Sequence, residues 1–410
     1  MISSKKMPEL LSPAGEWSAL HSAVRAGCDA VYFGVKGLNM RSSAGNFDIL
    51  EIRKVMDFIH KNGKKGFLAL NVIIYEHETE KARKILEESA RCGVDAVILW
   101  DMAVLNMAKE LGLEIHLSTQ ASISNFEAVK FYHSLGVRRI VLARECTLRD
   151  IKNIKARMSK EKIECELETF IHGAMCVSIS GRCFLSQHTF GKSANRGECL
   201  QPCRREFMIT DVDDESRYIL QQDRVLSPRD LCTLPFIEEL IEAGIDSFKI
   251  EGRMRPPEYV KTATLAYRRA IDAYAEGVLT EVLKEQLLAE LAQSFNRGFE
   301  QGFFFGAPGE LGADAQERDY EKVFLGEVLK YYNKINVAEV QLKHVGLSTG
   351  DEILVYGKTT PATFATVKEM EIKHSKVDSV EKGNKVGIKL EFTVRPKDKV
   401  FLWRRKRGDG

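Results

Sequence analysis

The feature that most constrains the fold is a repeated unit in which a helix-length segment ends at a glycine and a short apolar run follows. It reads RAGCDAVYFG, RCGVDAVILWD, SLGVRRIVLARE and EAGIDSFKIEG along the chain. Glycine suits the end of a helix because it adopts a left-handed backbone without steric cost. Nearly continuous apolar runs are typical of parallel strands buried on both faces. The repeat therefore predicts alternating helices and parallel strands.

Strand-length runs of this kind occur eight times, at 9–12, 30–35, 66–74, 96–101, 114–119, 139–145, 166–172 and 247–251. Eight strands that alternate with helices predict an α/β fold of the (β/α)8 TIM-like barrel type. The sequence has no G-x-G-x-x-G or Walker motif, which argues against an open nucleotide-binding sheet. Helices are expected at 16–26, 49–61, 78–92 and 125–135.

The rhythm breaks once, where about seventy residues separate the seventh run from the eighth. We expect a barrel domain over 1–295, with a cysteine-rich insertion at 174–233 after the seventh strand. A linker at 296–320 and a small all-β barrel at 321–410 are expected to follow, because short alternating strands replace the helical pattern there. Loops that follow barrel strands build the active face of this fold, so the insertion should lie over that face.

Cysteines are unevenly placed, and five of the nine lie in or at the edge of the insertion: Cys176, Cys183, Cys199, Cys203 and Cys232. The chain begins without a signal-peptide pattern and has no apolar run of membrane-spanning length, which predicts a cytoplasmic protein without membrane association. Disulfides are disfavoured in that compartment, and clustered cysteines there indicate metal or redox chemistry.

The environment of these cysteines favours iron over zinc. They form no C-x2-C pair, the commonest spacing in structural zinc sites. The glycines and cationic side chains around them suit an iron–thiolate cluster, because backbone amides can approach sulfur and cations offset its charge. We therefore expect an iron–sulfur cluster with four thiolate ligands; zinc and buried free thiols are the alternatives.

Polar residues at the carboxyl ends of the strands are candidates for chemistry. Glu168 and His172 lie on one strand at a spacing of four, which predicts a shared face and an acid/base pair. Arg253, the third catalytic candidate, and Arg144 suit an anionic ligand such as a carboxylate or phosphate. The substrate-binding candidates are His116, Gln120, Arg144, Lys249 and Glu251. The alternative for each residue is a structural hydrogen bond inside the barrel.

The overall charge excludes a generally basic nucleic-acid-binding protein. Lys and Arg number 60 against 58 Asp and Glu, so any RNA-binding surface must be local. Cations and rings interleave around the cysteines in a mixture that suits unpaired RNA: Arg182, Lys192, Arg196, Arg204 and Arg205 with Phe184, His188, Phe190 and Phe207. A second basic run at 404–407 is more typical of a solvated tail.

Several long motifs carry a resemblance to a known family. The segments PELLSPAG, DAVYFG, ELETFIHGAMCVSISGRCFLS, GKSANRGECLQPCRREF, LSPRDLC and FKIEGRMRPPEYV resemble peptidase family U32, also called collagenase-like peptidases. The C-terminal segment resembles the small barrel of that family, itself similar to the second domain of translation elongation factor Tu. The family includes reported collagenases, RNA hydroxylation proteins and a pair of ubiquinone hydroxylation proteins that carry 4Fe–4S clusters.

The resemblance implies specific chemistry, closest in character to the tRNA hydroxylation protein P group. That group forms 5-hydroxyuridine in tRNA, with prephenate implicated as a co-substrate. Cys176, Cys183 and Cys199 match cluster ligands that recur across the family, and either Cys203 or Cys232 supplies the fourth. The expected partners are therefore a tRNA or other RNA and a small carboxylate.

Three functions follow as hypotheses from these features. The first is iron–sulfur-dependent hydroxylation of an RNA base, with a tRNA uridine as the favoured substrate. The second is a peptidase, although the chain has no G-x-S-x-G or H-E-x-x-H motif. The third is an RNA-binding factor in which the metal is only structural.

Overall fold

A computed structural model describes residues 6–207, 209–210, 217–218, 226–306 and 320–405. Eight parallel strands form a closed barrel, because the last of them pairs with both the seventh and the first. The strands are β1 (Glu9–Ala14), β2 (Ala30–Phe33), β3 (Lys65–Ala69), β4 (Ala96–Leu99), β5 (Ile115–Leu117), β6 (Arg139–Val141), β7 (Glu166–Ala174) and β11 (Ser247–Ile250). The predicted (β/α)8 fold is confirmed, and each expected run overlaps one of these strands.

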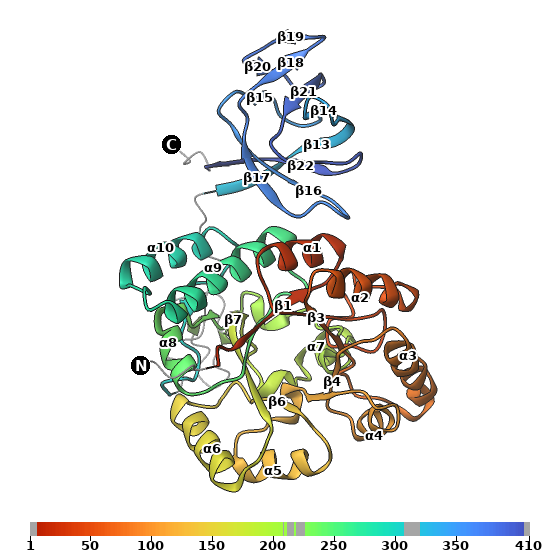
Figure 1. The fold of residues 1–410 in the computed structure, drawn as a ribbon, viewed down its shortest axis with the longest axis vertical. Coiled ribbons are helices and arrows are strands. Elements are labelled where there is room, and N and C mark those ends of the chain that lie inside the picture. Colours follow the sequence, from red (N-terminus) through yellow and green to blue (C-terminus); the bar gives the residue numbers. More distant parts are fainter. Residues whose placement is uncertain (1–5, 208, 211–216, 219–225, 307–319, 406–410) are drawn as a thin grey trace.

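Helices surround the barrel (Figure 1). They are α1 (Trp17–Arg25), α2 (Ile52–Lys61), α3 (Thr79–Arg91), α4 (Met102–Glu110), α5 (Phe126–Ser134), α6 (Leu148–Glu161), α8 (Ile237–Glu242), α9 (Pro257–Ala275) and α10 (Glu281–Ala292). Gly27 and Gly244 follow α1 and α8 with positive φ values of 88° and 78°, the conformation that ends a helix. The repeated glycine thus has the role that the sequence indicated.

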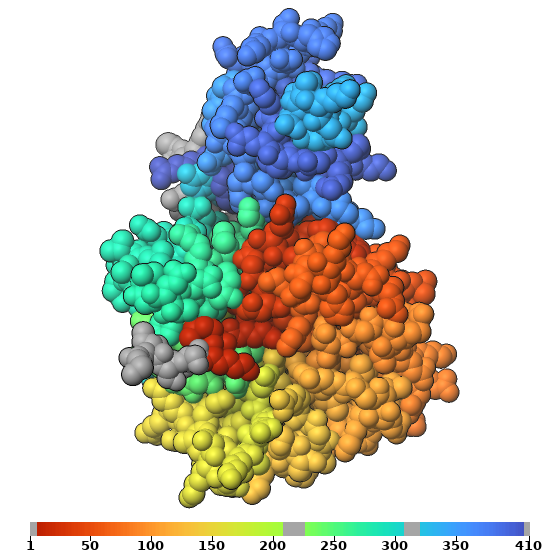
Figure 2. Space-filling model, in the orientation of Figure 1, coloured from red at the N-terminus to blue at the C-terminus, as the bar shows by residue number. Residues whose placement is uncertain are grey.

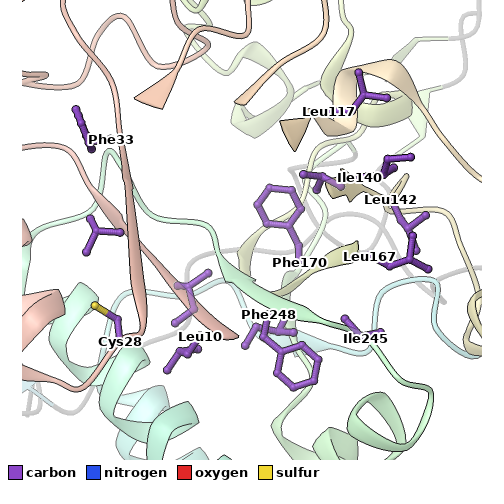
Figure 3. Packing of buried hydrophobic residues seen from close by; sticks show 14 of the residues in the cluster. Leu10, Cys28, Phe33, Leu117, Ile140, Leu142, Leu167, Phe170, Ile245 and Phe248 are labelled. Atoms are coloured by element: carbon purple, nitrogen blue, oxygen red, sulfur yellow. The ribbon is translucent and has the colours of Figure 1, made fainter. Parts of the chain in front are cut away.

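Apolar side chains fill the space between the strands and the surrounding helices, whereas the interior of the barrel also holds buried polar side chains. The main cluster packs the strands against the helices, and Figure 3 shows part of it, including Leu10, Ile140 and Phe248. A smaller cluster, which includes Leu11, Tyr32 and Phe67, brings together side chains from the first four strands. Buried charged residues from β6, β7 and β11 form a polar network beneath the functional cavity.

The insertion follows β7, as predicted, and covers the carboxyl ends of the strands. It holds α7 (Leu185–Phe190), β8 (Ile209–Thr210), β9 (Arg217–Tyr218) and β10 (Asp230–Cys232). β10 runs antiparallel to the end of β7, so the insertion returns to the barrel on the same strand that it leaves. β12 (Phe299–Glu300) pairs with β10 from the segment that follows α10.

An antiparallel β domain ends the described chain. Eight strands form one sheet in the order β17-β16-β22-β13-β14-β21-β18-β19. They are β13 (Tyr320–Tyr332), β14 (Val337–Gln341), β16 (Glu352–Tyr356), β17 (Thr363–Thr366), β18 (Met370–Ile372), β19 (Ser375–Lys376), β21 (Lys385–Lys389) and β22 (Lys399–Arg405), with β15 (Leu347–Ser348) and β20 (Ser379–Val380) paired separately.

This C-terminal domain packs along the barrel beside α1 and α9 (Figures 1 and 2). The backbone N–H of Ala362 donates to the buried Ser22 hydroxyl on α1, at 3.0 Å. Lys322 on β13 pairs with Glu258 at the start of α9. Among the described residues, no helix is long and apolar enough to cross a bilayer.

Candidate active site

Glu168 lies inside the barrel at the centre of a cationic network. Its carboxylate accepts hydrogen bonds from Lys249 Nζ at 2.8 Å and from Arg139 and Ser247, each at 3.2 Å. Burial opposes ionisation, but Lys249 and Arg139 outweigh it and lower the pKa of Glu168 to about 2. Glu168 is therefore a permanent carboxylate that holds Lys249 in position, rather than a proton donor near neutral pH.

His172 does not form the predicted pair with Glu168. Lys249 pairs with Phe170 and Ile250 pairs with His172, so Ile171 is an extra residue in β7. Such a bulge reverses the alternation of side chains, and the spacing of four no longer keeps the two residues on one face. The His172 ring packs instead among aromatic rings, 5.8 Å from Tyr259 and 5.5 Å from Tyr267. Burial lowers its pKa to about 3, so it stays neutral.

His116 also lies away from the cavity. It is fully buried on β5, its Nε2 is 2.9 Å from Glu114, and its ring meets Phe67 edge-on at 4.7 Å. Burial lowers its pKa. In this structure His116 fills the barrel interior instead of facing a ligand.

A cavity of about 570 Å³ lies above this layer, between the strand ends, the insertion and the C-terminal domain. Five of the predicted residues line it: Gln120, Arg144, Lys249, Glu251 and Arg253. Other polar and charged residues also line it: Tyr32, Arg41, Asn71, Ser118, Arg255, Glu258, Arg297 and Lys322. Asn71 and Ser118 follow strands and carry the same positional signal, whereas Lys322 comes from another domain and has no local signal.

The cavity wall is rich in cations, of which Lys249 and Arg253 are buried and Arg41 and Arg144 are partly buried. Arg41 pairs with Glu251 at 3.1 Å, but Arg144 and Arg253 have only neutral acceptors among the described residues. Arg144 donates to the Ala174 carbonyl at 2.8 Å and lies over the Phe170 ring at 4.1 Å. Arg253 donates to Asn39 Oδ1 at 3.1 Å.

The two arginines are therefore in an unfavourable environment unless an anion binds. Burial lowers the pKa of Arg253 to about 10 and also lowers that of Arg144. The Glu251 carboxylate acts electrostatically on both arginines but also on Arg41, so one negative charge is shared among three cations. Burying a cation whose charge is incompletely balanced is costly, whereas a guanidinium group that meets a carboxylate or phosphate forms strong paired hydrogen bonds. The wall is thus suited to an anionic ligand, as the sequence predicted for these two residues.

Four of the five candidate cysteines line the same cavity: Cys176, Cys183, Cys199 and Cys203. Cys232 does not; it is 3% exposed, and its sulfur accepts a hydrogen bond from Tyr267 at 3.6 Å, beside His172. The remaining cysteines of the chain are buried in the barrel. The geometry therefore favours Cys203 over Cys232 as the fourth member of the set.

The donor set fits an iron–sulfur cluster. Burial raises the pKa of Cys199 and Cys203, and the charges of Cys176 and Cys183 raise both further, so the four thiols lie within electrostatic reach of one another. Backbone N–H groups donate to Cys183 Sγ at 3.3 Å and to Cys199 Sγ at 3.4 Å, contacts that tune cluster thiolates.

A single metal ion fits this set less well. Among the described residues, no three His, Cys, Asp or Glu side chains converge on one point. A cluster is larger than an ion and takes one thiolate on each of its iron atoms. Four thiols that line one cavity match the number of thiolates that a 4Fe–4S cluster takes.

The outer surface of the insertion is basic and apolar. Arg196 turns inward, where it contacts Glu78 and the Ile73 carbonyl, and Arg204 donates to the Met175 carbonyl at 2.7 Å. Arg205 lies over the Phe190 ring at 4.5 Å. Four apolar side chains next to these residues are exposed: Ile179, Phe184, Leu200 and Phe207. Phe184 is 76% exposed beside Cys183, so the cavity rim presents an aromatic ring to solvent.

Comparison with known proteins gives the family. A model of peptidase family U32 matches residues 15–314. An uncharacterized protease of Methanocaldococcus jannaschii is 41% identical, over 97% of this chain and 98% of the relative. A collagenase of Porphyromonas gingivalis is 36% identical over 96% and 97%, and tRNA hydroxylation protein P1 of Bacillus subtilis is 36% identical over 86% and 84%. With matches of this extent, the chain belongs to peptidase family U32.

Proposed function

We propose that this chain is an iron–sulfur-dependent enzyme that hydroxylates a base in RNA, forming 5-hydroxyuridine in tRNA. One observation carries the proposal: a single cavity at the mouth of the barrel is lined by four thiols and by two arginines that form no ion pair with a carboxylate of the described residues. The similarity to a tRNA hydroxylation protein supports RNA as the substrate.

Cys176, Cys183, Cys199 and Cys203 would hold a 4Fe–4S cluster in the cavity wall. Such a cluster supplies electron-transfer or Lewis-acid chemistry beside the substrate. Arg41 lies near Cys199, and Arg204 lies near Cys203, where their positive charges favour the thiolate forms. The chain thus provides both ligands and compensating charge.

Arg144 and Arg253 would bind the carboxylate of a small co-substrate such as prephenate. Their guanidinium groups are held by the Ala174 carbonyl and by Asn39, which leaves other N–H groups for the ligand. Lys249, fixed by Glu168, places a third cation at the cavity floor. The anion would therefore be oriented before the base enters.

The base would be held by amide and hydroxyl groups that also line the cavity. Asn71 Nδ2 lies 3.2 Å from Ser118 Oγ, and Gln120 belongs to the same cluster. Enzymes that modify a base take it out of the stack and read its edge with such groups. These side chains are already held by hydrogen bonds to one another, so the pocket is polar and preorganised.

The collagenase among the relatives supports a peptidase as the second candidate. A cysteine protease pairs its thiolate with a histidine base. No histidine occurs among the described residues that line the cavity, and His172 is packed among aromatic rings. The geometry therefore favours hydroxylation over peptide cleavage.

Anaerobically purified protein tests the two candidates together. The proposal predicts stoichiometric iron and acid-labile sulfide, visible charge-transfer absorbance and no cleavage of gelatin. Protein without iron or sulfide would contradict it. Gelatin cleavage that persists after iron is removed would establish the peptidase instead.

A further inference from the structure

Three aromatic side chains form a cluster on the C-terminal domain. The rings of Tyr320 and Trp403 are stacked, with centroids 6.0 Å apart and 13° between their planes. Phe364 meets Trp403 edge-on at 5.2 Å. Phe364 is 38% exposed, and the other two are half-buried. We call these three residues the aromatic cluster.

The aromatic cluster lies on the outer face of the sheet. Along β22, Val400 and Leu402 enter the domain core, so Trp403 points to the opposite face. Trp403 pairs in register with Lys322, and Lys322 lines the cavity. Residues paired in this way lie side by side on one face of a sheet. The aromatic cluster is therefore adjacent to the cavity, on the side formed by the C-terminal domain.

Cations accompany the rings. Lys261 on α9 lies 5.6 Å from the centre of the Phe364 ring, and burial lowers its pKa. Arg405 is exposed and pairs in register with Tyr320. Two acids also lie near the rings: Glu352 is opposite Trp403, and Glu258 forms an ion pair with Lys322. Rings flanked by cations suit a polyanion whose units carry planar groups.

We propose that the aromatic cluster stacks against a base of single-stranded RNA, next to the base that enters the cavity. This inference rests on the proposed function, because it takes RNA as the substrate. A base that extends the Tyr320–Trp403 stack places its phosphates near Lys261 and Arg405. The C-terminal domain would then hold the flanking nucleotide while the barrel holds the target.

The alternative is that the aromatic cluster has only a structural role, in which its contact with Lys261 stabilises the packing of the C-terminal domain on α9. Stacking on a base predicts a change in tryptophan fluorescence on RNA binding, which a purely structural role does not predict. A base in contact with an indole ring quenches its fluorescence, and the affinity depends on the base rather than on the phosphate chain alone.

The experiment uses the full-length protein and a single-stranded oligoribonucleotide with the length of an anticodon loop. An oligomer with the same sugar–phosphate chain but abasic positions is the second probe. We expect the intact oligomer to quench tryptophan emission and to bind more tightly than the abasic one. Trp403→Ala should weaken binding of the intact oligomer about 5- to 100-fold and abolish most of the quenching.

Two further variants separate stacking from stability. Trp403→Phe keeps a ring, so it should retain most of the affinity while losing the quenching. Phe131→Ala removes an aromatic side chain that is 58% exposed on α5 and should bind as the wild type does. Equal binding and quenching by intact and abasic oligomers would overturn the proposal, as would wild-type affinity in Trp403→Ala.

RNA binding by the aromatic cluster and hydroxylation in the cavity can be tested separately. If RNA binding depends on Trp403 but the protein hydroxylates no base, the stacking surface is supported and the proposed reaction is wrong. If Trp403→Ala leaves both the hydroxylation and the RNA affinity unchanged, the proposed reaction is supported and the stacking surface is wrong.

Discussion

Lys249 Nζ lies 2.8 Å from the Glu168 carboxylate, and both side chains are almost fully buried beneath the cavity. Arg139 contacts the same carboxylate at 3.2 Å and also pairs with Glu9 and Glu166. The cavity floor is thus an ion network whose geometry fixes Lys249. It sets where a positive charge meets an incoming anion, and it links four strands of the barrel, β1, β6, β7 and β11.

Glu168→Gln should destabilise the protein by about 3–5 kcal/mol, because it leaves two buried cations without their shared counter-charge. Denaturant unfolding measures the loss. Glu110→Gln is the matched control: Glu110 pairs with Arg83 on the surface at 3.0 Å, and its loss should cost less than about 1 kcal/mol. Equal effects of the two substitutions would contradict the network.

The same carboxylate gives a pH dependence. The pKa of Glu168 is about 2 in the folded protein, below its ordinary value of 4.5. A lowered pKa contributes stability that is complete above the ordinary value and is lost as the pH falls toward the folded value. Unfolding free energies measured from pH 5 to pH 2 should therefore fall more steeply for the wild type than for Glu168→Gln. Parallel curves would show that Glu168 is not ionised in the folded state.

Arg253→Gln should weaken the binding of a small carboxylate by roughly 30-fold or more, because it removes a buried charged donor from the cavity. Titration calorimetry with prephenate on the cluster-loaded protein measures this, and the iron content should not change. Arg83→Gln, on the surface, should bind as the wild type does. Retained affinity in Arg253→Gln would remove this residue from the anion site.

Substitution of Cys203 and Cys232 decides the fourth cluster ligand. Cys203 lines the cavity with Cys176, Cys183 and Cys199, whereas Cys232 is buried beside Tyr267. Cys203→Ala should lose most of its iron and sulfide, and Cys232→Ala should keep both while losing about 1 kcal/mol of stability. The opposite pattern of metal content would assign the role to Cys232.

The sequence predicted the barrel because its evidence is local. Six of the eight strands are short apolar runs after a helix-ending glycine. The exceptions are β1, which no helix precedes among the described residues, and β7, where Lys162 takes the left-handed conformation at the end of α6. The place of the insertion followed from the one break in the rhythm. The carboxyl ends of the strands also predicted five of the barrel residues that line the cavity, because the fold always brings those ends together.

The errors arose where a contact depends on more than spacing. One extra residue at Ile171 reverses the face of His172, and alternation alone cannot show a bulge. Cys203 and Cys232 have equally suitable spacings, but only the return of β10 along β7 shows that Cys232 lies outside the cavity. Lys322 reaches the cavity from a separate domain, so no pattern within the barrel could have indicated it.

Nucleoside mass spectrometry tests the central claim most directly. The tRNA would come from a strain that lacks this protein, complemented with the wild-type chain, with Cys183→Ala or with Cys92→Ala, which changes a buried cysteine that does not line the cavity. We predict that 5-hydroxyuridine is absent from the deletion strain and is restored by the wild type and Cys92→Ala, but not by Cys183→Ala. Unchanged 5-hydroxyuridine in the deletion strain, or full restoration by Cys183→Ala, would contradict cluster-dependent hydroxylation at this site.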